Sequence, residues 1–574
     1  MLRKFARFYG SHHRNKRFKI LLKILPLVVL ILGSLIVAGY ALQELLNPPQ
    51  GRSLPISSAQ VSSAQASVQP GRSSSCGSKT GGPQENAIRT DDNKAAPDWT
   101  DAIRWNCVYN INDFSGSDWN ARFNLAVDAA ANSGGGVIYF PAGTYEFTDS
   151  IALKNSVVIR GETPSVQSAK SPNYRPGTQF VFPKYAAQTS GSGTPNATAF
   201  KKITTQNPVT DSNIGLVNLD INRAAISFSD NVDTSQNQNI VVFGVRSNNV
   251  AMPDPKVPDL NFQAPWQRYS YRFAANIEVT ALKNILIANN RLNDQITDNF
   301  EQPGYQLKSA DKKSTITYKN GEKAVFHYGN HYGIVVNRSK QGTGFKLAAT
   351  PQTEPGLFRQ GISIRDNWVY HTMRVAIQAS GQGLVIQNNQ IKDEPNKQWW
   401  VDPTGTKAAT GAVTLENRAI DWSGWDVKIT GNQYEVYRHR IGDTGYLSVD
   451  GEGILIQECC GGTTVKNITL KNNQGNGYIG LYKVQDIEVV KILDNQLTNA
   501  DILVLADTNN RPYSMNKVEI INNKVDGNIV ARAGQGGTNN LIRNNQGNNN
   551  GKIEYSCHVQ VENNSGFEVK PCGQ

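Results

Sequence analysis

Short segments rich in isoleucine and valine recur along the second half of the chain, and each ends in asparagine, usually as the second of a polar pair. The segments are ILIANN (285–290), ISIRDN (362–367), LVIQNN (384–389), VKITGN (427–432), ITLKNN (468–473), VVKILDN (489–495), VEIINN (518–523), LIRNN (541–545) and VQVENN (559–564). Most successive final asparagines lie about 22 residues apart, or about twice that, which indicates a solenoid built from one short repeat.

The alternation of apolar and polar residues in each segment predicts a strand that sends every second side chain into a narrow interior. Asparagine tolerates the left-handed backbone of a sharp corner, and stacked amides can hydrogen-bond from one turn of the solenoid to the next. One repeat cannot bury its apolar face alone, so the repeats must fold as a stack. We therefore interpret the asparagine pairs, and the sequon at Asn467 among them, as structural.

A different pattern precedes the repeats. Apolar residues at helical spacing predict a helix over Ala121–Ala131, which the glycines at 134–136 end. A strand at 137–140, a turn at 141–145 and a second strand at 157–160 follow. The helix is expected to cap the N-terminal end of the stack.

This opening, DFSGSDWNARFNLAVDAAANSGGGVIYFPAGTYEF (113–147) followed by SVVIRGE (156–162), resembles the opening of the pectate-lyase-like superfamily. That group includes polysaccharide lyases, polygalacturonase-like hydrolases, alginate epimerases and phage tailspikes. The resemblance implies an all-β fold, a right-handed parallel β-helix. It implies no particular reaction, because this fold hosts many functions. The motifs Gly-His-Gly, Arg-Ile-Lys and Asp-Pro-His are missing, so no catalytic residue is carried over.

Charge is concentrated at the N-terminus. Residues 1–23 hold eight basic side chains and no acidic one, out of a net charge of +11 for the chain. The high isoelectric point therefore gives no reason to expect nucleic acid as a partner. The apolar stretch Ile24–Leu42 is long enough to span a bilayer, and the basic residues before it predict a cytoplasmic N-terminus.

The predicted organisation is a basic cytoplasmic tail (1–23), a transmembrane anchor (24–46), a flexible linker rich in Ser, Gln, Gly and Pro (47–98) and the β-helix (99–574). A cleaved signal peptide is the alternative, with Gly39 and Ala41 at the cleavage site. Either way, residues 50–574 lie outside the cytoplasm, in the periplasm or the extracellular space.

Six cysteines fit such a compartment. Cys557 and Cys572 are placed to staple the C-terminal end, and Cys76 is placed to reach Cys107. The adjacent Cys459 and Cys460 are either a strained disulfide or two separate thiols.

Cleavage of a glycosidic bond usually takes two carboxylates. Asp450 and Glu452 lie two residues apart, and an extended chain would place both on one face. They are the predicted acid/base pair, with Glu458 as a third acid nearby. The alternative is a turn, because Asp-Gly and Glu-Gly are ordinary turn pairs.

Basic and imidazole side chains lie close by in the sequence. Arg438, His439 and Arg440 precede the acid pair, and arginine binds carboxylates of acidic sugars through two hydrogen bonds. By resemblance to β-helix lyases, Arg440 is the candidate base; an exposed, solvated strand is the alternative. His371 and Arg374 are further candidates for the wall of a cleft.

Flat aromatic rings stack on sugars. The candidate platforms are Trp399, Trp400, Trp422 and Trp425, with packing of loops onto the solenoid as the alternative. His327 and His331 lie in a strand-like context, so no metal site is predicted, and Asp220 is interpreted as a corner residue. The resemblance allows a Ca²⁺ dependence, although no dedicated carboxylate cluster supports it.

Together these features predict a membrane-anchored, extracytoplasmic, carbohydrate-active protein. The leading hypothesis is a lyase or hydrolase that cleaves an extracellular or cell-envelope polysaccharide. The alternative is a non-catalytic β-helix that binds or organises such a polysaccharide.

Overall fold

The computed structural model describes, apart from short gaps, residues 76–183, 201–248, 274–293, 331–337, 360–392, 418–436, 452–456 and 465–572, with a few short strands between them. These residues belong to one compact unit, Ser73–Gln574. The predicted tail, the anchor at Ile24–Leu42 and most of the linker lie outside the described residues. Within the described ranges, no helix is both long and apolar enough to cross a membrane.

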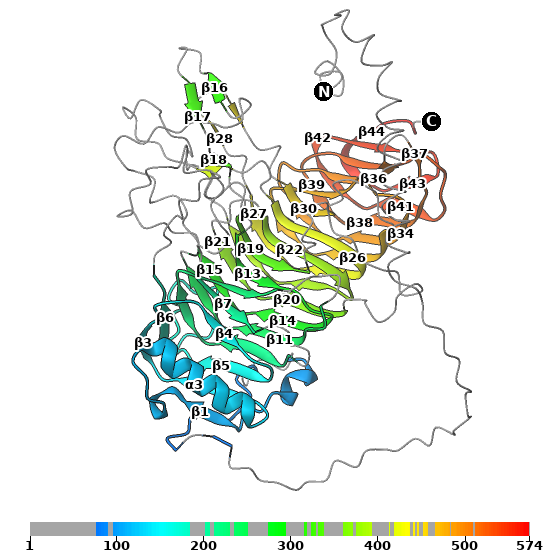
Figure 1. The fold of residues 1–574 in the computed structure, drawn as a ribbon. Coiled ribbons are helices and arrows are strands. Elements are labelled where there is room, and N and C mark those ends of the chain that lie inside the picture. The colour runs from blue at the N-terminus through cyan, green and yellow to red at the C-terminus, as the bar shows by residue number, and fades with distance from the viewer. Residues whose placement is uncertain are drawn as a thin grey trace, which may run out of the picture. The chain divides into compact units, whose positions relative to one another are not determined.

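The fold is a parallel β-helix: the chain coils so that each strand pairs in parallel with the strand one turn earlier and the strand one turn later (Figure 1). In the described residues the main sheet has 38 strands, and all of them except β37 form three faces. We name them A, B and C, in the order in which the chain visits them in each turn.

Face A comprises β1 (Val108–Asn110), β2 (Gly136–Phe140), β5 (Val157–Gly161), β8 (Ile214–Val217), β11 (Gln238–Phe243), β14 (Lys283–Ala288), β20 (Gln360–Arg365), β23 (Val385–Gln387), the second half of β26 (Arg418–Thr430), β31 (Val465–Lys471), β34 (Ile487–Leu493), β38 (Met515–Ile521), β41 (Asn540–Arg543) and β43 (Val559–Glu562).

Face B comprises β3 (Gly143–Glu146), β6 (Thr178–Val181), β9 (Asp220–Asn222), β12 (Arg246–Asn248), β15 (Arg291–Asn293), β21 (Trp368–Tyr370), β24 (Gln390–Lys392), β27 (Gln433–Glu435), β32 (Gln474–Gly475), β35 (Gln496–Leu497), β39 (Lys524–Val525) and the starts of β42 (Gln546–Tyr555) and β44 (Ser565–Val569).

Face C comprises β4 (Ile151–Leu153), β7 (Lys201–Thr205), β10 (Ala224–Phe228), β13 (Ala274–Val279), β19 (His331–Val336), β22 (Val375–Gln382), the first half of β26, β30 (Glu452–Ile456), β33 (Tyr478–Leu481), β36 (Ile502–Thr508), β40 (Ile529–Ala533) and the later parts of β42 and β44.

Short elements lie outside these faces. Two of them are the 3₁₀ turns η1 (Asp98–Ala102) and η2 (Ile111–Asp113). Three are strand pairs: β16 (Thr315–Thr317) with β17 (Lys323–Val325), β18 (His327–Tyr328) with β25 (Ala412–Val413), and β28 (Arg440–Ile441) with β29 (Gly445–Tyr446). The last is β37 (Arg511–Pro512), which pairs with the end of β36.

A ladder of nine buried or half-buried asparagines runs along the corner between faces A and B, at the positions that the repeat predicts. The side-chain Nδ2 of each asparagine donates to the side-chain Oδ1 of the next one, at 2.9–3.0 Å. The ladder runs over Asn290, Asn367, Asn389, Asn432, Asn473, Asn495, Asn523, Asn545 and Asn564. Asn473 shows the full set of contacts. Its Nδ2 also donates to the carbonyl of Ile429 (2.9 Å), and its backbone N–H donates to Asn495 Oδ1 (2.9 Å).

The residue before each ladder asparagine takes the left-handed conformation that makes the corner. These residues have φ between 52° and 67°: Asn289, Asp366, Asn388, Gly431, Asn472, Asp494, Asn522, Asn544 and Asn563. The two residues of a pair thus have different tasks, since the first bends the chain and the second bonds to the next turn of the solenoid. This division of labour explains why the segments end in pairs.

A second left-handed column lies at the start of the face A strands, and it includes Asn239, Asn284, Asn467, Val489 and Lys517. Val489 has a φ of 55°. A β-branched residue is strained there, because its Cβ approaches the following carbonyl oxygen. The neighbouring turns of the solenoid hold Asn467 and Lys517 at the same position.

The predicted capping helix is confirmed as α3 (Trp119–Asn132), which begins two residues before the predicted bound. Asp118 caps it, because its carboxylate accepts the N–H of Ala121 (2.8 Å). Its buried face, which includes Phe123 and Val127, packs on the first strands at the N-terminal end of the stack (Figure 1).

The boundary of the folded unit differs from the prediction. Residues 76–89, expected to be linker, pack on the β-helix; we call them the N-terminal strap. Ile88 is fully buried against the outward valines of face A, including Val158. The buried Arg160 donates to the carbonyl of Glu85 (2.8 Å) and pairs with its carboxylate. The strap has three glycines among 14 residues and is otherwise mostly polar, with Ala87 and Ile88 as its aliphatic residues, so its composition is that of a linker.

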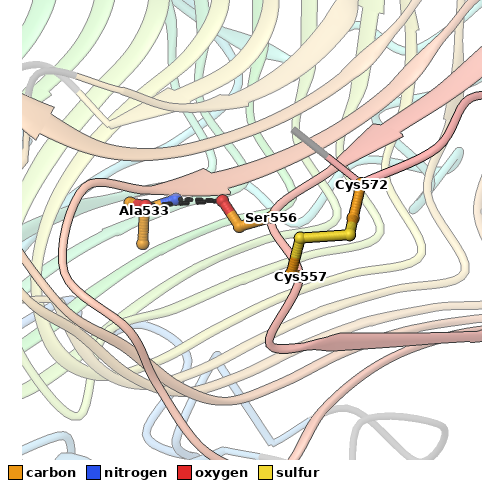
Figure 2. Close-up of a disulfide and its surroundings, with 4 residues drawn as sticks. All are labelled: Ala533, Ser556, Cys557 and Cys572. Atoms are coloured by element: carbon orange, nitrogen blue, oxygen red, sulfur yellow. Dashed lines mark hydrogen bonds between the residues drawn. A yellow bond between two sulfur atoms is a disulfide. The ribbon is translucent and has the colours of Figure 1, made fainter. Parts of the chain in front are cut away.

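The C-terminal end of the stack is closed by a disulfide. Cys557 and Cys572 are bonded, with their Cα atoms 4.9 Å apart (Figure 2). Next to them, Ser556 Oγ accepts the backbone N–H of Ala533 (3.1 Å), which ties this loop to face C. The staple predicted from the sequence is therefore present at the end of the β-helix.

We expect Asn473→Ala to lower the free energy of unfolding by about 3 kcal/mol, because it leaves buried N–H and C=O groups of two neighbouring turns without partners. The matched control is Asn472→Gly, next to it but exposed and in the left-handed region, which should change stability by less than about 0.5 kcal/mol. Denaturant unfolding monitored by circular dichroism measures both. Equal effects would contradict a special role for the ladder.

We also expect Val489→Asn to raise the free energy of unfolding by about 1 kcal/mol, because asparagine adopts the left-handed conformation at lower cost than valine. Lys517→Asn, at the next corner, should give a smaller gain, since lysine is not β-branched. The melting temperatures of the two variants test this, and a destabilised Val489→Asn would show that packing of the valine outweighs its backbone strain.

Candidate functional site

The described residues include three of the predicted site residues: Glu452, Trp422 and Trp425. Arg440 lies in β28, but its side chain is outside the described part of the structure. The remaining candidates also lie outside it: Asp450, Arg438, His439, Glu458, Trp399, Trp400, His371 and Arg374. Their convergence with Glu452 stays a prediction.

Glu452 belongs to a buried polar cluster on the outer side of face C. We call it the Arg418 cluster, and it comprises Gln378, Arg418, Asp421, Glu452, Tyr478 and Tyr482. Parallel pairing places Arg418, Glu452 and Tyr478 side by side on three successive strands, β26, β30 and β33. Gln378 and Asp421 form a second row three residues further along β22 and β26.

The direction of these side chains follows from their neighbours. Ile420 and Trp422 belong to the interior core, so Asp421 between them points outward. Yet Asp421 is 0% exposed and Glu452 is 4% exposed. The cluster therefore places two carboxylates and a guanidinium away from water, which is costly unless each charge is paired.

Arg418 joins the two carboxylates. Its Nε pairs with Glu452 Oε2, and its Nη1 lies 3.3 Å from both oxygens of Asp421. Asp421 Oδ2 also accepts from Gln378 Nε2 (3.5 Å). One planar guanidinium thus fixes both acids in position, which a lysine could not do with the same geometry.

Two tyrosines complete the cluster on the side of Glu452. Tyr478 donates its hydroxyl hydrogen to Glu452 Oε1 (2.9 Å), and the Tyr478 and Tyr482 hydroxyls are 3.1 Å apart. Burial, together with the negative charge of Glu452, raises the pKa of Tyr478 and of Tyr482. Both phenols therefore stay protonated at neutral pH, and Tyr478 remains a hydrogen-bond donor to the carboxylate.

The preceding turns on face C are mostly apolar on their outer side, with Glu278 of β13 as a charged residue in the row of Val335, Gln378 and Asp421. The outward-facing residues Ala275, Tyr332, Val335 and Val375 form a buried apolar cluster on β13, β19 and β22. Val375 pairs directly with Arg418 in the register. The change from apolar to charged residues along one face marks the Arg418 cluster as a local departure from the pattern.

A second buried carboxylate, Asp220, has a structural explanation. It accepts from Arg246 Nη1 (3.0 Å), and Arg175 Nε lies 3.3 Å away. Burial raises the pKa of Asp220 against the opposing effect of both arginines. Arg291 holds the same loop through the carbonyl of Ala169 (3.0 Å). Asp220 thus anchors a loop on face B, consistent with its interpretation as structural.

Trp422 does not fit the role predicted for it. It is 0% exposed and packs inside the β-helix, so it cannot stack on a sugar. The sequence IDWSGWD did not show which tryptophan points inward, because that depends on the register of β26. Trp425, three residues later, is half-buried and stays a candidate.

Sequence reasoning missed Arg418, Asp421, Tyr478 and Tyr482. A signal was available: Arg418 and Asp421 flank the apolar Ala419 and Ile420 in the strand that lies one turn before GEGILI. Tyr478 and Tyr482 carry no such signal, because half-buried tyrosines are common in strands. Within the described ranges, no group of three or more His, Cys, Asp or Glu side chains is placed to hold a metal ion.

Comparison with known families agrees with the fold. A family model described as rhamnogalacturonase A/epimerase, pectate lyase-like, matches residues 109–299. The resemblance read from residues 113–147 and 156–162 is thereby confirmed, and the chain carries a pectate-lyase-like parallel β-helix. The matched residues end before the Arg418 cluster.

Solved structures also match along most of the chain. They include the A-module of the mannuronan C-5 epimerase AlgE4 of Azotobacter vinelandii (13% identity, 81% of this chain, 97% of that chain, TM-score 0.34) and the Streptococcus pneumoniae surface adhesin PfbA (13%, 81%, 93%, 0.33). A third is the catalytic unit of the GH87 alpha-1,3-glucanase of Streptomyces thermodiastaticus (11%, 81%, 69%, 0.33). These likenesses are too remote to assign an activity. No curated protein sequence matches significantly.

The two tryptophans of β26 give a direct test of the geometry. Trp422→Ala should lower the free energy of unfolding by about 4 kcal/mol, because it opens a cavity in the core. Trp425→Ala should cost about 1 kcal/mol or less. Thermal or denaturant unfolding measures both values, and a larger effect at Trp425 would contradict the register of β26.

Proposed function

Starting from a pectate-lyase-like parallel β-helix, we propose that this chain is a carbohydrate-active enzyme that cleaves a polysaccharide at the outer side of face C. The Arg418 cluster carries the proposal. An apolar surface like that of Tyr332 and Val335 would cover this face at lower cost than buried ions do. Charges kept at such a cost are typical of functional sites.

Glu452 is the proposed catalytic carboxylate. It touches both Arg418 and Tyr478, which hold its carboxylate in position. Asp450 is the proposed partner that shares the acid/base work with it. Fully buried Asp421 acts as a positioning residue, because it orients Arg418 without reaching the substrate.

The remaining candidates from the sequence complete the proposed groove. Arg438 and Arg440 would hold an acidic sugar or, in an elimination, Arg440 would remove the proton. His371, Arg374, His439 and Glu458 would contribute polar contacts. Trp399, Trp400 and Trp425 would stack on sugar rings. Hydrolysis and elimination both remain within the proposal. In hydrolysis the base takes a proton from water and in elimination from a carbon of the sugar ring, but the sugar binds in the same place.

The place of action is also proposed. The apolar stretch Ile24–Leu42, with basic residues before it, supports a single membrane anchor with a cytoplasmic N-terminus. The β-helix would then face an extracellular or cell-envelope polysaccharide. A β-helix needs no active site for stability, so the second candidate function is a non-catalytic one, in which the same face binds or organises the polysaccharide.

The test is to incubate the protein with neutral and acidic polysaccharides and to follow reducing ends together with ultraviolet absorbance. New reducing ends with absorbance from an unsaturated product indicate a lyase, and reducing ends alone indicate a hydrolase. We expect Glu452→Gln to lower kcat by at least about 100-fold, because it removes the acid/base group.

The matched control is Glu519→Gln, which removes a surface carboxylate 3.8 Å from Lys491 on face A and should leave kcat unchanged. Asp421→Asn should alter the pH profile through Arg418 more than it alters KM. Full activity of a folded Glu452→Gln protein would refute the catalytic assignment. Binding of a polysaccharide without any cleavage would favour the non-catalytic function.

A further inference from the structure

The N-terminal strap brings two thiols together. Cys107, immediately before β1, is fully buried in the interior core, and the partly exposed Cys76 packs against that core. Gly77, next to Cys76, lies against the backbone of Val108, next to Cys107, so the two cysteines sit on adjacent backbone segments. We propose that Cys76 and Cys107 form a dithiol site that a small disulfide oxidant converts into a disulfide, which locks the strap to the first turn of the β-helix.

The contacts around the thiols already hold the strap in place. Gly77 has a φ of 109°, and a Cβ added to it would lie only 2.9 Å from the carbonyl oxygen of Val108. Further along, Asn110 Nδ2 donates to the carbonyl of Gly81 (3.0 Å). Thr80 donates to the carboxylate of Asp113 from its backbone N–H (3.0 Å) and its hydroxyl (2.8 Å). The strap therefore lies alongside residues 107–113, and the bond needs little rearrangement.

The reaction has a defined order. The thiolate of Cys76 attacks the oxidant RS–SR, forms a mixed disulfide and releases RS⁻, which takes a proton from water. The thiolate of Cys107, having lost its proton to solvent, then attacks Cys76 Sγ and expels the second RS⁻. Two thiols are oxidised and one RS–SR is reduced to two RSH. Burial raises the pKa of Cys107 to about 11, so the exposed Cys76 reacts first.

The bond would close a loop of about 30 residues and would add to the contacts that hold the strap. Cys76 is the first described residue of the folded unit. A disulfide here therefore fixes the strap to the first turn at its N-terminal end. The disulfide Cys557–Cys572 closes the other end of the stack in the same way.

Full-length protein, first reduced, is incubated with oxidised glutathione, alkylated and digested with trypsin. The expected product links peptide 73–79 to peptide 105–122. In the oxidised protein, backbone amides of residues 77–89 should exchange with deuterium at least about tenfold more slowly, and dithiothreitol should reverse this.

Single variants separate the two thiols. Cys107→Ser should stop at a glutathione adduct on Cys76, whereas Cys76→Ser should leave Cys107 unmodified, because Cys107 is reached only through Cys76. The inference is overturned if Cys76 and Cys107 are alkylated separately after equilibration, if Cys76 is linked to another cysteine, or if Cys107 reacts equally well in Cys76→Ser. The wild-type cross-link is a sufficient test even if Cys107→Ser fails to fold.

Discussion

The asparagine ladder from Asn290 to Asn564 is the interaction on which the rest of the β-helix depends. Each ladder amide bonds to neighbouring turns through its donor and its acceptor, so the turns satisfy one another's buried polar groups. These hydrogen bonds therefore allow only one register between the strands of neighbouring turns. The same register continues along faces B and C, so the outward residues of successive turns are aligned in rows. The Arg418 cluster exists because such a row brings Arg418, Glu452 and Tyr478 together.

Asp220 and the Arg418 cluster, two buried charged groups on the outside of the solenoid, illustrate how structural and functional uses differ. Asp220 is surrounded by arginines that also hold a loop, so its charge is explained by the packing of that loop. Around Arg418 two carboxylates share one guanidinium, and the Tyr478 hydroxyl donates to Glu452. Buried ion sets of this kind seldom stabilise a fold more than apolar residues would. This cost is the physical basis on which we propose a functional use for the second group.

A stack of strands has two ends, and each must be covered because its last strand has unpaired backbone groups and an open core. Helix α3 and the strap cover the first turns, and the disulfide Cys557–Cys572 secures the last ones. The strap covers the outward valines of face A, which explains why β2 and β5 are buried on both sides. Specific contacts thus hold the two ends of the stack, whereas repeated strand pairing and the asparagine ladder hold its middle.

The sequence by itself determined the repeat, the ladder positions, the capping helix and the pectate-lyase-like class, because local periodicity and corner-forming asparagines are readable along the chain. It singled out Glu452 as a candidate but did not point to the residues that contact it. Arg418 and Asp421 lie more than 30 residues before Glu452 in the sequence, and only parallel pairing makes them neighbours. The sequence does not distinguish Trp422 from Trp425, and only the register of β26 places Trp422 inside the β-helix. The strap was missed for the same reason: its composition is that of a linker, and tertiary contacts such as Arg160 with Glu85 decide that it folds.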